Sequence, residues 1–125
     1  MSTVTLADHP VVQTAYGRWQ ALNDPLGVTA FGINAIVCDP GEAIETEHDE
    51  SDTGQQEVYV VLAGRVAFRH GPERLEGGPG TVFSAPDPAV TRSLEALEPG
   101  SRVVCIGGLP STVETDYGTW ITAKG

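Results

Sequence analysis

Clusters of turn-forming residues divide most of this 125-residue chain into short β-prone runs. Asp-Pro-Gly, Gly-Pro, Gly-Gly-Pro-Gly, Pro-Asp-Pro and Glu-Pro-Gly separate segments rich in Val, Ile, Tyr and Phe. The expected strands lie at 28–38, 43–48, 57–63, 65–70, 81–85, 89–97 and 102–106. Short strands joined by such turns are typical of a sandwich or barrel, and no helical pattern of 10 to 15 residues lies between them. The sequence therefore predicts an all-β fold.

The chain is long enough for one hydrophobic core and too short for two domains. We expect residues 1–25 to form an irregular or partly helical lead-in, 26–108 to form the β domain, and 109–125 to form a C-terminal tail. Within the lead-in, Tyr16, Trp19 and Leu22 recur at helical spacing. The sequence Asn-Asp-Pro that follows at 23–25 predicts the end of any such helix.

The net charge is −10, which would repel phosphate backbones and anionic lipids and so disfavours nucleic acid and membrane partners. The amino-terminal residues lack the basic start and continuous apolar run of a signal peptide. No apolar run approaches the roughly 20 residues that span a bilayer. We therefore expect a cytoplasmic protein. Cys38 and Cys105 each lie in an apolar run, which favours buried thiols over a disulfide or a ligand pair.

The segment from Gly41 to Gly64 places one histidine, His48, and one glutamate, Glu57, next to a strongly β-forming run. The order glycine, histidine, glutamate, glycine resembles the first motif of the cupin family, and the spacing from Glu57 to Gly64 matches it. The resemblance covers about residues 26–108. It implies a jelly-roll β-barrel, and from the family it also implies a homodimer.

The histidines depart from this resemblance. Metal-binding cupins usually supply three histidines and one glutamate, whereas this chain has three histidines in all. His9 lies in the lead-in, and His70 ends a strand beside Gly-Pro. Depending on the alignment, the other histidine position of the first motif is Glu50 or Thr46, and the histidine position of the second motif is Thr91. The three-histidine site cannot be built.

Strand alternation predicts which side chains share a face. Glu57, Tyr59 and Val61 lie on one face of their strand, which the resemblance directs into the barrel. In the strand 89–97, Arg92 and Leu94 lie on the more apolar face. A buried arginine needs an acceptor because an unpaired buried charge is very costly, and Glu57 is the candidate.

Three interpretations of this site follow. In the first, a Glu57–Arg92 pair joins two strands and binds nothing. In the second, Arg92, with Tyr59 and His48, holds the carboxylate of a small ligand, because guanidinium groups match carboxylates. In the third, His48, Glu57 and Glu50 (or Glu47) bind a divalent metal such as iron, manganese, nickel or zinc.

The matching functions are a small-molecule-binding protein with an anionic ligand, a metal-dependent oxygenase or isomerase that uses His48 and Glu57, and a non-catalytic structural or interaction protein. In the last case Val61 and Leu94 would fill the barrel. The sequence leaves open whether the protein is an enzyme, and we take the small-molecule-binding protein as the leading interpretation.

Overall fold

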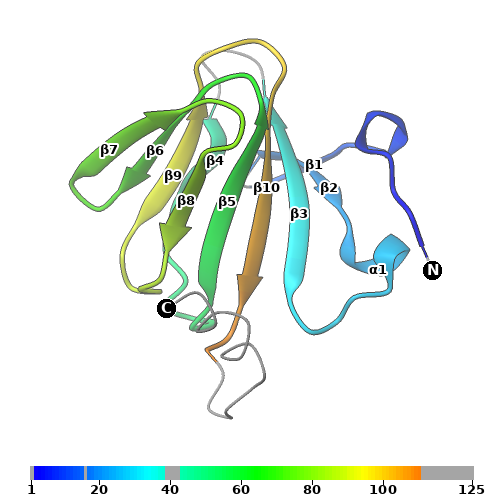
Figure 1. Cartoon of the computed structure of the whole chain (residues 1–125). Helices are drawn as coiled ribbons and strands as arrows, with labels where there is room; N and C mark the ends of the chain where they lie inside the picture. Colours follow the sequence, from blue (N-terminus) through cyan, green and yellow to red (C-terminus); the bar gives the residue numbers. More distant parts are fainter. Residues whose placement is uncertain (1, 16, 39–42, 111–125) are drawn as a thin grey trace, which may run out of the picture.

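The computed structural model describes residues 2–15, 17–38 and 43–110, with backbone only at 38 and 43–46. Ten strands and two short helical segments make up this part of the chain (Figure 1). They are η1 (Leu6–Asp8), β1 (Val12–Thr14), β2 (Gly17–Ala21), α1 (Asn23–Leu26), β3 (Gly32–Cys38), β4 (Ala43–His48), β5 (Gln56–Ala63), β6 (Val66–His70), β7 (Glu73–Gly77), β8 (Val82–Ala85), β9 (Arg92–Ala96) and β10 (Ser101–Gly108). The expected all-β fold is confirmed. The strand β7 was not expected from the sequence.

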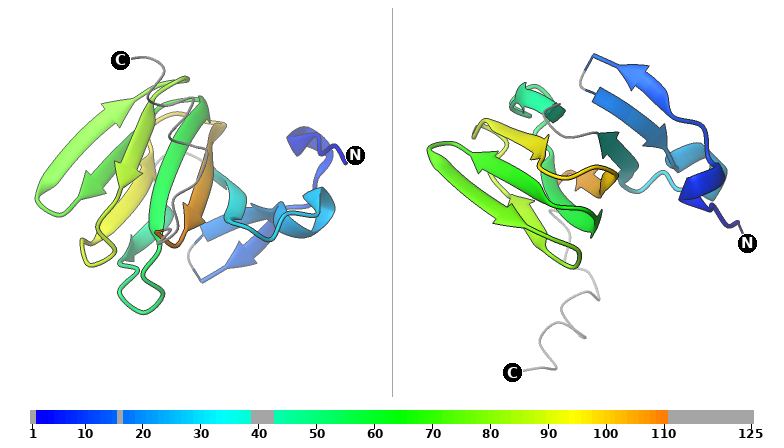
Figure 2. Two further views of the ribbon diagram at one scale, coloured as in Figure 1. Left: turned by 60° about the horizontal axis from the view of Figure 1, so that its bottom comes forward. Right: turned by 90° about the horizontal axis from the view of Figure 1, so that it is seen from above.

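The strands form two antiparallel sheets. One has the order β1-β2-β3-β10-β5-β8, and the other has the order β4-β9-β6-β7. Figure 2 shows the four-stranded sheet facing part of the larger one, with β1 and β2 extending the larger sheet beyond β3. No helix in the described ranges is long and apolar enough to cross a membrane.

The lead-in is partly helical, as expected, but it also supplies two strands. Trp19 lies in β2, where it pairs with Ile36, so its helical spacing was misleading. Tyr16 lies outside the described residues. The sequence at 23–25 begins the short helix α1 rather than ending one. Proline is tolerated there because the first turn of a helix needs no amide hydrogen bond, and the Asn23 side chain donates to the carbonyl oxygens of Val28 and Phe31.

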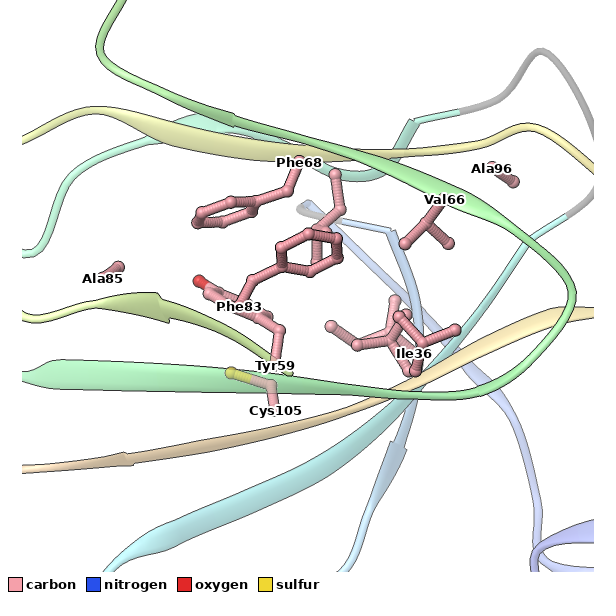
Figure 3. Packing of buried hydrophobic residues seen from close by; sticks show 11 residues of the cluster. Ile36, Tyr59, Val66, Phe68, Phe83, Ala85, Ala96 and Cys105 are labelled. Carbon is pink, nitrogen blue, oxygen red and sulfur yellow. The ribbon is translucent and has the colours of Figure 1, made fainter. Parts of the chain in front are cut away.

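The core lies between the two sheets (Figure 3). The ring of Phe68 packs between Tyr59 and Phe83, at centroid distances of 5.4 and 5.0 Å. Val61 and Leu94 are both buried in this cluster. The space between the sheets is thus packed with side chains around these rings, in line with the filled-barrel interpretation.

The predicted strand alternation is confirmed on both strands. Glu57, Tyr59 and Val61 are buried on the inner face of β5, and Val58 and Val60 lie on its outer face. On β9 the inner residues are Arg92, Leu94 and Ala96. The fold therefore brings a charged side chain from each sheet into the interior.

Candidate functional site

A row of three basic side chains crosses the four-stranded sheet. His48 on β4 pairs with Arg92 on β9, and Arg92 pairs in turn with His70 on β6. Directly paired residues of neighbouring strands share a face. Arg92 is only 1% exposed on the inner face, so both histidines lie on that face beside it.

Glu57 reaches this row from the facing sheet. Its Oε1 atom accepts hydrogen bonds from Arg92 Nη1 at 3.2 Å and from the Tyr59 hydroxyl at 2.7 Å. Its Oε2 atom accepts from the Cys105 thiol at 3.4 Å. The pair expected between Glu57 and Arg92 is therefore present. Cys105 is a buried thiol, as expected, whereas the side chain of Cys38 lies outside the described residues.

The environment of Glu57 favours its ionised form. Burial raises the pKa of this carboxyl, but hydrogen bonds from His48, Tyr59 and Cys105 outweigh burial, and the pKa lies below its ordinary value. Glu57 is thus a carboxylate fixed by donors.

His48 and Glu50 form the more accessible part of the site. His48 Nε2 lies 3.3 Å from Glu50 Oε1 and 3.7 Å from Glu57 Oε1, and the side chains of His48 and Glu50 are 14% and 18% exposed. The Thr53 hydroxyl donates to Glu50 Oε2 at 2.8 Å and orients that carboxylate. Together His48, Glu50 and Glu57 offer three ligand atoms within 4.8 Å of one another.

The ligand atoms of His48, Glu50 and Glu57 are close enough together to bind a divalent metal. One of the oxygens, Glu57 Oε1, already accepts hydrogen bonds that use its lone pairs. Imidazole and carboxylate suit iron, manganese or zinc. However, Glu57 Oε1 already accepts from Tyr59 and Arg92, which occupy the two lone pairs of that oxygen. A metal bound there would have to displace one of these donors, and it would lie beside the Arg92 guanidinium.

Two buried nitrogen atoms in the row have no hydrogen-bond partner among the described residues, namely Arg92 Nε and His70 Nε2. Arg92 Nη2 is satisfied by the Asp87 carbonyl oxygen at 2.9 Å. Unpaired buried polar atoms are rare because each costs free energy. Each of these two atoms could therefore gain from a hydrogen bond to an additional polar group.

Comparisons with solved structures decide the fold. The chain is similar to a cupin protein from Bacteroides fragilis, with 18% identity, a TM-score of 0.67, and coverage of 86% of this chain and 90% of that chain. A predicted oxalate decarboxylase from Thermotoga maritima gives 14% identity, a TM-score of 0.72, and coverage of 86% and 99%. The chain therefore has the cupin fold. KdgF from Halomonas is a third similar structure, with 20% identity, a TM-score of 0.67, and coverage of 84% and 92%. No protein-family model and no curated protein matches the sequence.

Glu47 and His9 lie away from the centre of this site. Glu47 is exposed, since it alternates with the inward-facing His48. His9 Nε2 lies 3.0 Å from the Ala21 carbonyl oxygen in the lead-in. His70 ends β6, as expected, but it lies on the inner face beside Arg92. Its alternation with Val66 and Phe68, both buried, was the signal that could have placed it inside.

A hollow of about 370 Å³ lies elsewhere on the protein, and we call it the outer groove. It is lined by residues that include Val58, Ser84 and Ile106, which alternate with the inner residues of β5, β8 and β10. Glu57 is the one residue of the polar site that also borders it. The outer groove is therefore a separate feature from the row of basic side chains.

Proposed function

We propose that this cupin binds a small molecule through an acceptor group, such as a carboxylate, held between Arg92 and His70. The observation that carries the proposal is the pair of unsatisfied buried nitrogens, Arg92 Nε and His70 Nε2, on directly paired strands. A carboxylate would accept from both, because the Nε–H of arginine and its neighbouring Nη–H form a fork that matches two oxygens.

In this proposal the other residues of the site position Arg92. Glu57 and the Asp87 carbonyl oxygen hold the guanidinium in place, and Tyr59 holds Glu57. His48 and Glu50 lie at the more exposed side, where a ligand would enter. Because the rings of Tyr59, Phe68 and Phe83 fill the adjacent interior, the ligand must be small.

A thermal-shift screen with small carboxylates tests the proposal. We expect at least one of formate, acetate, oxalate or malonate to raise the Tm of the parent protein. His70→Gln should lower the affinity about tenfold, since one hydrogen bond to a charged group contributes on the order of 1.5 kcal/mol. His9→Gln, a histidine substitution outside the site, should bind as the parent does.

The screen also has a clear negative outcome. If no carboxylate stabilises the parent protein and a crystal structure shows only water between Arg92 and His70, the site is structural. The filled-barrel interpretation would then hold.

A second candidate is divalent metal binding, favoured by the spacing of His48, Glu50 and Glu57. A bound metal would supply a Lewis acid for oxygenase or isomerase chemistry. Elemental analysis of protein purified without chelator tests it. Near-stoichiometric metal that is lost in His48→Ala would favour this candidate, and absence of metal even after it is added back would remove it.

Cytoplasmic location and homodimer formation also belong to the proposal. The edge strand β1 supports a dimer, because Val11 and Val12 are 46% and 56% exposed beside unpaired backbone groups. Light scattering should give the mass of a dimer for the parent and of a monomer for Val12→Lys, with Leu75→Lys as a control. A monomeric parent protein would contradict this part.

A further inference from the structure

Several apolar side chains line the outer groove, and two of them are well exposed. It is lined by Phe31, Gln56, Glu57, Val58, Ser84, Pro86, Ile106, Gly107, Gly108 and Leu109. Phe31 is 42% exposed and Leu109 is 70% exposed. Contiguous exposed apolar side chains in a hollow typically mark a binding surface. The question is what covers this one.

The chain itself supplies a suitable occupant. The described residues end at Pro110, immediately after Leu109, which borders the outer groove. Residues 111–125 follow, and they include Tyr117, Trp120 and Ile121. We propose that this carboxy-terminal segment docks in the outer groove through Tyr117 and Trp120.

The length of the segment allows this docking. Trp120 follows Leu109 by eleven positions, which at about 3.3 Å per residue gives a reach of up to ~36 Å. From Ile106 to Leu109 the groove extends only about 10 Å along β10. The segment can therefore reach every lining residue with chain to spare.

The chemistry of the segment also fits. Val113, Tyr117, Trp120 and Ile121 have the spacing of one apolar side, with polar residues between them. Aromatic rings with one polar atom suit a groove that is mostly apolar and offers a few hydrogen-bonding groups, here Gln56 and Ser84.

Tethering favours this occupant over a second copy of the chain. A segment joined directly to the groove is present at an effective concentration on the order of millimolar. A surface of another molecule must compete from the much lower concentration of free protein. The segment 111–125, which follows the groove residue Leu109 in the sequence, is therefore the preferred occupant.

Fluorine NMR of the full chain tests the proposal. The protein has two tryptophans, Trp19 and Trp120, so 5-fluorotryptophan labelling gives two resonances, which Trp120→Phe assigns. The solvent isotope shift between H₂O and D₂O measures exposure of each ring. We expect the shift of Trp120 to be at most about half that of the free amino acid.

Groove variants locate the contact. Phe31→Ser combined with Leu109→Ser should raise the isotope shift of Trp120 about twofold, toward the free value. Both side chains are exposed, so the fold should tolerate the change. Leu75→Ser is the matched control, since Leu75 is 53% exposed on β7 in the other sheet, and it should leave the shift unchanged.

Three outcomes would overturn the proposal. The first is a Trp120 ring that is fully exposed in the parent protein. The second is protection that the groove variants do not reduce. The third is protection that appears only as protein concentration rises, which would assign the groove to a second copy of the chain.

Discussion

Arg92 carries a permanent positive charge into the interior of a small protein. Its neighbour Thr91 occupies the position where the family motif has a histidine, but alternation directs Arg92 inward. The guanidinium is compensated by Glu57, and neither side chain can reach bulk water without leaving the core, since they are 0% and 7% exposed. The cost of burying each charge is thus offset only while the other is present.

Replacement of Arg92 should therefore be strongly destabilising. We expect Arg92→Met to lower the free energy of unfolding by about 3–5 kcal/mol, because it leaves the Glu57 carboxylate buried without its charged partner. Urea denaturation followed by circular dichroism measures this change. Arg69→Met, on the same sheet but exposed, should stay within about 0.5 kcal/mol of the parent.

A double variant separates the contribution of the Glu57–Arg92 ion pair to stability from that of the packing of the Arg92 side chain. Glu57→Gln with Arg92→Met should be more stable than Arg92→Met alone, because no buried charge is left unpaired. Equal stabilities of the single and double variants would show that Glu57 does not depend on Arg92.

The ionised state of Glu57 predicts a pH dependence. Its pKa in the folded protein lies below its value in the unfolded chain, so its contribution is complete above the unfolded pKa and is lost as the pH falls through the lower, folded value. Glu57→Gln should be less stable than the parent near neutral pH but should lose less stability between about pH 5 and about pH 3. Urea midpoints across this range measure the effect.

The exposed Glu95 provides the comparison for that experiment, through Glu95→Gln. An acid dependence of Glu57→Gln as steep as that of the parent would contradict a stabilising role for the ionised carboxylate.

At the scale of elements, the hairpin between β5 and β6 depends on one glycine. Gly64 has φ of +74°, and a Cβ atom there would collide with Ser101. The Ser101 hydroxyl also binds Arg65, donating to its carbonyl oxygen and accepting from its amide. The turn and the start of β10 are therefore fitted against each other.

Gly64→Ala should cost about 2–4 kcal/mol, from a left-handed backbone angle and a steric clash together. Gly80→Ala separates the cost of the backbone angle from the cost of the clash, because Gly80 has φ of +89° but no atom lies within 4 Å of the added Cβ. It should cost only about 1–2 kcal/mol. Thermal unfolding of the two variants compares them, and equal losses would mean that the contact with Ser101 contributes nothing.

Alternation within strands allowed much of the site to be predicted from sequence. A period of two put Glu57 with Tyr59 on one face and Arg92 with Leu94 on the more apolar face of another strand, and the resemblance to cupins directed the Glu57 face inward. The trio His48, Glu50 and Glu57 also came from sequence, because the motif order brought these residues to one end of the sheet.

The sequence could not reveal how strands pair across the molecule. His70 lies beside Arg92 because β6 pairs with β9, and no local signal near Gly71-Pro72 indicates this long-range register. The strand β7, which is exposed until Gly77, lacks an apolar pattern altogether. In the lead-in, Trp19 forms a strand because β3 provides a partner, so tertiary pairing overrode the local helical spacing.

Across the whole molecule, stability should differ between the centre and the edges of the sheets. Strands β3, β10 and β5 are neighbours in the middle of the larger sheet, whereas β1 and β7 are edges with exposed residues. In hydrogen exchange we expect amides of β10 to open only on global unfolding, and those of β1 to open at a cost lower by at least about 2 kcal/mol. Uniform protection across both sheets would contradict this gradient.

The place of β10 in the larger sheet has a consequence for synthesis of the protein. This strand lies between β3 and β5, yet it follows every other strand of the described residues in the sequence. Until residues 101–108 have left the ribosome, the larger sheet can exist only as two separate groups of strands, β1-β2-β3 and β5-β8, and β3 and β5 each have an open edge. Strand β10 joins the two groups, so the larger sheet can be completed only once residues 101–108 are free to pair.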